Sequence, residues 1–222
     1  MPTFEELVAR FSFLAATPAI AAVFITAATL VIMHDRRVLI AAFATQSVFA
    51  GLLFTRLLPP QIAGAKVITG LLISVLFFVT SRQMSLAAQA AGRAASAPRA
   101  RWQPEPGLPF RTFAVVMVGL VGGQLAAQFD VGGAALDADI VTATVLLAGL
   151  GLLLLGLTDE PFRVGLGLLT VLTGFELFYA SVEPALAVMA LLAAVDFAVA
   201  LGSSYLAIIR STAAQPDEEP LR

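Results

Sequence analysis

Long apolar runs separated by short polar breaks dominate the chain. A bilayer core about 30 Å thick requires roughly 20 apolar residues of helix, and seven runs approach that length. Proline and charged residues gather in the breaks, where helices begin and end. The pattern predicts an all-α membrane protein with about seven transmembrane helices, at 11–33, 38–57, 60–81, 110–128, 138–157, 161–182 and 184–209.

Composition supports the membrane class. The 222 residues are 59% hydrophobic and only 13% charged, which leaves too few polar side chains to cover a soluble domain. A net charge of −2 gives no reason to expect nucleic acid as a partner. The chain has no Cys and a single His, His34. We therefore expect a lipid bilayer around the protein, and neither a metal nor a cofactor inside it.

The segment 81–111 differs from the apolar runs on either side of it. It is rich in Ala, Pro and Arg and has little to bury, which predicts a loop or surface helix between two halves. We expect one membrane domain over 1–222. Its parts are a three-helix unit at 1–81, a loop at 82–109, a connector helix and outer loop at 110–137, a second three-helix unit at 138–210, and a disordered tail at 211–222.

The distribution of basic residues predicts the orientation. With the N-terminus outside, only Arg10 and Arg56 lie on the outer side. Glu5 and Glu6 precede Arg10, so the start lacks the basic character of a secretory signal, and we expect the first run to remain as a helix. The C-terminus is then cytoplasmic. The cytoplasmic side receives Arg36, Arg37, Arg82, Arg93, Arg99, Arg101, Arg111, Arg163, Arg210 and Arg222.

Three ionisable residues, Lys66, Glu176 and Asp196, fall inside the predicted helices. Such groups are costly in a membrane and are functional candidates by default. Lys66 and Glu176 could instead reach the interface along their own helices. Asp196 is about 18 Å deep at 1.5 Å per residue, so its short side chain must face protein or water. A buried ion pair that only fixes helix register remains an alternative.

The last helix also carries a stripe of small residues on the side opposite Asp196, since two residues turn a helix by about 200°. Small residues let another helix approach closely, and ordinary helix packing accounts for the stripe. Its members are Ala190, Ala194, Ala198 and Gly202.

The two halves show an internal repeat. A shift of 130 residues places Lys66 on Asp196 and Gln46 on Glu176, with a spacing of 20 in both halves. Two three-helix units joined by one connector predict parallel copies. If they pack about a pseudo-twofold axis, Lys66 could pair with Glu176, and Asp196 would lie about 9 Å deeper. Such a staggered line suits stepwise proton transfer.

The last three helices resemble the K-chain family of respiratory complex I, also found as the C chain of Mrp-type sodium/proton antiporters. The matching segments are "GLLTVLTGFELFYAS" and "ALLAAVDFAVALGSSYLAI". Glu176 and Asp196 match the two family carboxylates, although the second is usually Glu. The whole chain resembles hydrogenase-4 component E through "RRVLIAAFATQSVFAG" and "AGAKVITGLLISVLFFVTSRQ".

This resemblance implies a non-redox subunit, in a prokaryotic plasma membrane, of a complex I-like, group 4 hydrogenase-like or Mrp-like assembly. Antiporter-like membrane chains would be its partners. Glu176 and Asp196 would carry protons or cations together with Gln46, and Lys66 would tune a carboxylate through its charge. No catalytic site of its own is expected. A scaffold without a transport role and a small stand-alone ion carrier remain alternatives.

Overall fold

The computed structural model describes residues 17–90, 107–128, 137–183 and 185–213. Within these ranges the protein is all-α, which confirms the predicted class. Each predicted helix has a counterpart. The helices are α2 (Thr17–Ile32), α3 (Arg36–Phe54), α4 (Pro60–Ala90), α5 (Leu108–Gln128), α6 (Ala138–Gly156), α7 (Pro161–Val182) and α8 (Leu186–Ala213).

Six of the described helices, all except α2, are long and apolar enough to cross a membrane. Residues 11–16 of the first predicted helix lie outside the described residues. The prediction that the loop begins at residue 82 is wrong, because α4 continues to Ala90. The sequence "SRQMSLAAQA" contains no Gly or Pro to stop it and is rich in good helix formers. Similarly, α8 continues to Ala213, three residues beyond the predicted end of the second three-helix unit at residue 210.

Local signals explain where several helices begin. The Asp35 carboxylate accepts a hydrogen bond from the Arg37 N–H and caps α3. The Asp137 carboxylate accepts one from the Asp139 N–H and caps α6. Each cap satisfies a backbone donor that has no partner within the helix. Pro161 begins α7, where the missing N–H costs nothing.

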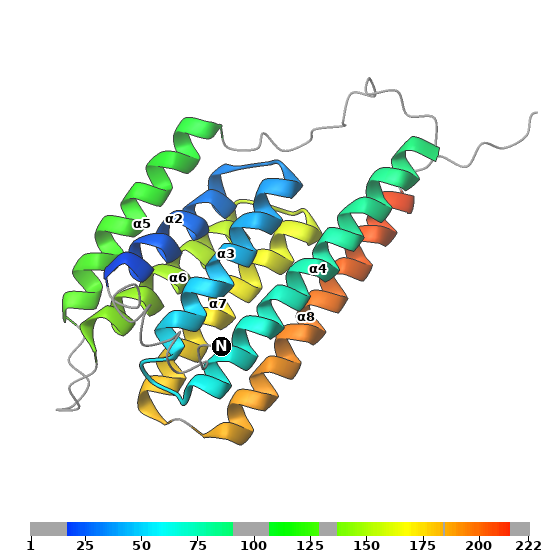
Figure 1. Cartoon of the computed structure of the whole chain (residues 1–222). Coiled ribbons are helices and arrows are strands. Elements are labelled where there is room, and N and C mark those ends of the chain that lie inside the picture. The colour runs from blue at the N-terminus through cyan, green and yellow to red at the C-terminus, as the bar shows by residue number, and fades with distance from the viewer. Residues whose placement is uncertain (1–16, 91–106, 129–136, 184, 214–222) are drawn as a thin grey trace, which may run out of the picture.

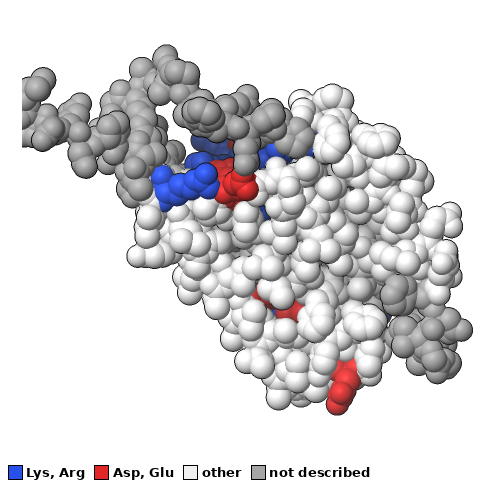
Figure 2. Space-filling view, turned by 180° about the vertical axis from the view of Figure 1, so that it is seen from behind, with Lys and Arg blue, Asp and Glu red and all other residues white. Residues whose placement is uncertain are grey.

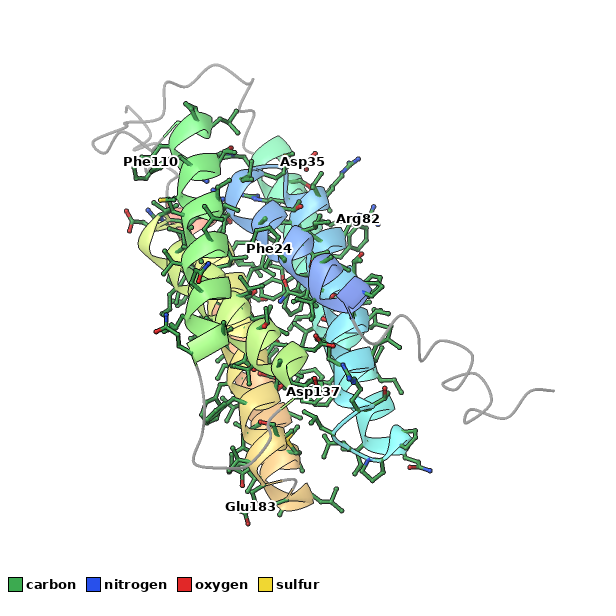
Figure 3. The ribbon with its side chains drawn as sticks, turned by 90° about the vertical axis from the view of Figure 1, so that its left-hand side faces the viewer. Phe24, Asp35, Arg82, Phe110, Asp137 and Glu183 are labelled. Atoms are coloured by element: carbon green, nitrogen blue, oxygen red, sulfur yellow. The ribbon has the colours of Figure 1, made fainter. Side chains whose placement is uncertain are left out.

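The helices form one elongated bundle (Figure 1). α4 and α8 pack together along one edge, α5 lies along the opposite edge, and α2, α3, α6 and α7 fill the space between. The bundle has two distinct ends: Asp35 and Phe110 lie toward one, and Asp137 and Glu183 toward the other (Figure 3). The helices that bear Lys66 and Asp196 therefore lie side by side at the edge of the molecule.

The helix boundaries revise the register of the predicted repeat. α2 ends at Ile32 and α6 at Gly156, α3 begins at Arg36 and α7 at Pro161, and α4 begins at Pro60 and α8 at Leu186. Corresponding ends are thus 124, 125 and 126 positions apart. The shift of 130 is about one helical turn too long. α2 contacts α6, α3 contacts α7 and α4 contacts α8, which agrees with a parallel pseudo-twofold arrangement.

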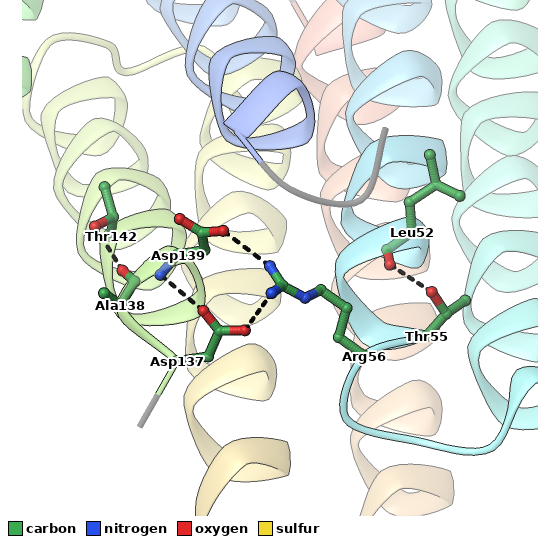
Figure 4. A network of polar contacts seen from close by, with 7 residues as sticks. All are labelled: Leu52, Thr55, Arg56, Asp137, Ala138, Asp139 and Thr142. Carbon is green, nitrogen blue, oxygen red and sulfur yellow. Dashed lines mark hydrogen bonds and ion pairs between the residues drawn. The ribbon is translucent and has the colours of Figure 1, made fainter. Parts of the chain in front are cut away.

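Ion pairs join the two halves at both ends of the bundle. Arg56 contacts Asp137 at 2.7 Å and Asp139 at 2.9 Å (Figure 4). At the other end, Arg36 contacts Glu160 at 2.8 Å. All these side chains are about one-third exposed, so each pair contributes at most about 1 kcal/mol. We refer to the two ends as the Arg56 end and the Arg36 end.

Two of the arginines assigned to the cytoplasmic side are buried. Arg111 of α5 and Arg163 of α7 are 0% and 3% exposed. Arg111 donates to the Val31 carbonyl at 3.2 Å, and Arg163 donates to the carbonyls of Val31 and Met33 at 3.1 Å. The last carbonyls of a helix lack intrahelical partners and carry partial negative charge. Both arginines therefore bind the C-terminal end of α2 to the helices around it.

Glycines allow α6 and α7 to approach until their backbones touch. A Cβ atom on Gly151 would lie 2.9 Å from both the Gly167 carbonyl oxygen and the Val171 nitrogen. A Cβ on Gly174 would lie 3.0 Å from the Thr144 carbonyl oxygen. Backbone atoms cannot move aside as a flexible side chain can, so these contacts define the spacing of the two helices.

We expect Gly151→Ala to destabilise the protein by about 1–3 kcal/mol, because the new methyl group would force α6 and α7 apart. The measurement is the thermal unfolding midpoint in detergent. Gly123→Ala in α5 is the matched control, since no atom of another described helix lies within 4 Å of a Cβ at that position. Equal midpoints for the two variants would contradict this account of the α6–α7 interface.

Candidate functional site

The structure brings Lys66, Glu176 and Asp196 into one ion triplet. Lys66 Nζ lies 2.5 Å from Glu176 Oε1 and 3.0 Å from Asp196 Oδ2. The three side chains come from α4, α7 and α8. Glu176 is 1% exposed, and the other two side chains are 10% exposed. The charged groups thus meet inside the bundle.

This geometry decides between several sequence predictions. Lys66 and Glu176 do not extend along their own helices to the interface, because they contact each other. The predicted Lys66–Glu176 pair is present. The staggered line with Asp196 about 9 Å deeper is wrong. The flexible Lys66 side chain reaches both carboxylates, so the three groups form one cluster and not a series of steps.

Close packing of α3 on α4 positions the turn that carries Lys66. A Cβ on Gly51 would lie 2.0 Å from Val67 Cγ2, and one on Gly70 would lie 2.5 Å from the Ser47 side chain. With no side chain at either glycine, α3 and α4 approach closely on both sides of Lys66. The ammonium is consequently held toward α7 and α8, away from the outer face of α4.

Asp196 faces inward on α8, on the same side as buried Met189, Ala200 and Ser204. The small-residue stripe on the opposite side of α8 is exposed in this chain. No atom of the described residues lies within 4 Å of a Cβ placed on Gly202. Packing against another of the described helices therefore does not explain the stripe.

Gln46, the fourth predicted site residue, lies outside the ion triplet. It is 1% exposed on α3, and its Nε2 atom donates to Thr170 Oγ1 of α7 at 3.4 Å. Its Oε1 atom has no hydrogen-bond partner among the described residues. The shift of 130 that aligned Gln46 with Glu176 did not predict this contact, which joins positions 124 apart.

A small cavity lies beside the ion triplet. Its volume is about 30 Å³, and its lining includes the three charged side chains and the residues Ser47 and Thr173. That volume holds about one water molecule, which requires two to four polar partners. Neither hydroxyl residue was among the site residues predicted from the sequence. Thr170, Thr173 and Glu176 recur every three residues on α7, and that spacing was the available signal.

Most charged groups on the visible face lie near its edges. Figure 2 shows blue and red atoms gathered at one edge, one red group at the opposite edge, and a small red spot in the middle of an otherwise white face. Among the described residues, no three His, Cys, Asp or Glu side chains are grouped so that they could hold a metal ion. The site's chemistry is therefore that of an ammonium, two carboxylates and neighbouring hydroxyls.

Charge balance indicates what the ion triplet can do. When all three groups are ionised, two carboxylates face one ammonium, and one negative charge remains uncompensated. An uncompensated charge inside a membrane protein is unfavourable. Uptake of one proton by either carboxylate would neutralise the cluster. The arrangement can therefore bind and release a proton while the Lys66 charge stays in place.

Comparisons with protein-family models, with curated proteins and with solved structures find no match to this chain.

We expect Lys66→Met to destabilise the protein by about 3–5 kcal/mol, because it leaves two buried carboxylates without their cation. Combining Lys66→Met with Glu176→Gln and Asp196→Asn removes all three charges, and we expect this triple variant to be the more stable of the two. Thermal unfolding midpoints in detergent compare them. If the triple variant unfolds at or below the midpoint of Lys66→Met, electrostatic compensation is not what Lys66 provides.

Proposed function

We propose that this protein is a non-redox integral membrane subunit that takes part in proton, or cation, translocation through Lys66, Glu176 and Asp196. The observation that carries the proposal is the ion triplet itself, with its ammonium shared between two carboxylates inside the bundle. A cluster with one carboxylate in excess can take up and release a proton in a region where charge is otherwise excluded.

The resemblance of the chain to hydrogenase-4 component E supports the class of assembly. On this proposal the partners are antiporter-like membrane chains of a complex I-like, group 4 hydrogenase-like or Mrp-like complex. The small-residue stripe of α8 supports a multi-subunit assembly, because it is exposed and small residues let a neighbouring helix approach closely. The chain contains no nucleotide motif and no Cys, and on this proposal the driving reaction belongs to another subunit.

The proposal also includes the orientation. The Arg36 end faces the cytoplasm and the Arg56 end faces outward, in a prokaryotic plasma membrane. Arg56 and the acidic residues Asp137 and Asp139 meet at one end, which agrees with their assignment to the same side. Arg36, Arg111 and Arg163 belong to the opposite end, where the C-terminal end of α2 lies.

We expect replacement of Glu176 by Gln together with Asp196 by Asn to abolish most proton translocation by the assembled complex. Neither amide can take up the proton that the carboxylates bind. The assay is acidification of membrane vesicles followed with a pH-sensitive dye, after native electrophoresis has shown that the complex is intact. Glu183→Gln is the control, because this carboxylate is exposed in the link between α7 and α8.

Two outcomes would favour the alternative functions. Translocation at the wild-type rate in an intact double variant would leave the ion triplet a purely structural element of a scaffold subunit. Proton transport by the purified chain alone in liposomes would instead identify a stand-alone carrier.

A further inference from the structure

Buried polar side chains are unevenly distributed on the helices around the ion triplet. α3 and α7 begin at the Arg36 end, and α4 and α8 end there. Among the described side chains of these four helices, every buried polar one outside the triplet lies between the triplet and the Arg36 end. These residues are Gln46, Ser74, Thr80, Arg163, Thr170 and Ser204.

The side chains between the ion triplet and the Arg56 end are different in polarity. Between the ion triplet and the Arg56 end, the buried side chains described on the same four helices are all apolar. The largest of them are at most 3% exposed and are Leu53, Phe54, Leu177 and Met189. Apolar side chains offer a water molecule no hydrogen bond, so water is not expected to persist there. This layer separates the triplet from the Arg56 end.

On the polar side, partners for water begin next to Glu176. Thr173 lines the cavity with the triplet. Thr170 follows one turn further and contacts Gln46, whose Oε1 atom has no partner among the described residues. Leaving a buried acceptor unsatisfied costs about 1–3 kcal/mol, which a bound water molecule would recover. Ser204 Oγ, nearer the Arg36 end, also has no partner in the described structure.

An aromatic pair stands between this polar stretch and the Arg36–Glu160 ion pair. The rings of Phe77 and Phe162 meet edge to face with centroids 5.1 Å apart, and both are 0% exposed. The Arg36 guanidinium lies 6.0 Å from the Phe162 ring centroid. Phe77 also reaches α7, because a Cβ on Gly165 would lie 3.3 Å from its ring. The two rings thus form an apolar layer between this polar stretch and the Arg36–Glu160 ion pair.

We propose that the ion triplet exchanges protons with the Arg36 end only, through water bound along Thr173, Thr170 and Gln46, and that Phe77 and Phe162 restrict this route. In each exchange, a hydronium ion arriving from that end gives its proton to a carboxylate of the triplet and leaves as water. The reverse step returns the proton. This inference rests on the proposed function for its proton chemistry, and it adds the side of access and the residues that define it.

The chain contains no Cys, so single cysteines can be introduced without a background thiol. The probe is Ag⁺, which is small enough for a narrow hydrated route and reacts with thiols. Thr170→Cys tests the polar side and Leu177→Cys the apolar side. The exposed positions Asp159→Cys and Gln61→Cys identify which end faces the medium. The full chain is placed in membrane vesicles of both orientations and exposed to Ag⁺. The protein is then denatured and labelled with a maleimide, and the loss of labelling measures how much of the cysteine Ag⁺ has modified.

We expect Ag⁺ to modify Thr170→Cys at least about tenfold faster when it is added on the Asp159 side, a ratio that corresponds to about 1.4 kcal/mol. Leu177→Cys should react slowly from both sides. When Phe77→Ala is added to Thr170→Cys, Ag⁺ supplied on the Asp159 side, at the Arg36 end, should modify the cysteine faster still. The rate with Ag⁺ supplied on the opposite side should not change. Size-exclusion chromatography in detergent checks that each variant is folded.

Three results would overturn the inference. They are equal rates at Thr170→Cys from the two sides, a reaction of Leu177→Cys as fast as that of Thr170→Cys, and no reaction at Thr170→Cys even with Phe77→Ala. The assay requires no pumping, so its outcome is independent of the translocation measurement. A complex that pumps normally without both carboxylates would refute the proposed function, whereas symmetric access of Ag⁺ would refute only the sidedness.

Discussion

Charged side chains within a membrane protein are tolerated only when protein or water compensates them. In this protein Lys66 provides that compensation to Glu176 and Asp196 at 2.5 and 3.0 Å. The contact requires α4, α7 and α8 to lie in one register, because a shift of a single turn would move a charge by about 5.4 Å. The arrangement of the α4–α8 edge against α7 therefore depends on this electrostatic constraint.

The constraint is met through close helix packing. Gly51 and Gly70 let α3 lie directly on α4 beside Lys66, while Gly151 and Gly174 bring α6 and α7 into backbone contact. Helices in a membrane gain no hydrophobic driving force from packing together, so dispersion and polar contacts must hold them. The ion triplet, the Gln46–Thr170 contact and the buried arginines supply the polar part.

The ion triplet that stabilises the packing of the helices could also bind a proton. One ammonium cannot compensate two carboxylates fully, and the cluster lies beside a cavity that holds about one water molecule. Buried polar groups continue from it toward the Arg36 end, and apolar groups occupy the Arg56 side. A fully paired structural salt bridge would require neither the excess carboxylate nor the one-sided polar stretch. These two features are the structural basis on which we propose translocation as the role of the site.

By itself, the sequence determined the class of fold and the approximate helix boundaries. Apolar runs of bilayer length can only be helices or parts of a closed barrel, since every backbone polar group must be satisfied within the membrane. The sequence also identified Lys66, Glu176 and Asp196, because an ionisable residue within such a run is conspicuous. Thr170, Thr173 and Ser47 were not conspicuous, since hydroxyl residues are common in membrane helices and can bond to their own backbone.

Only the tertiary structure decided how these residues combine. The sequence shift of 130 was wrong by about a turn, because apolar segments align with many partners and polar matches within them are few. The structure also shows that Arg111 and Arg163 are buried against the end of α2, and that the small-residue stripe of α8 is exposed. Which face of a helix is buried depends on its neighbours. The sequence of a helix that is apolar on all sides does not predict which face is buried. It lacks the polar face that would indicate the direction of the core.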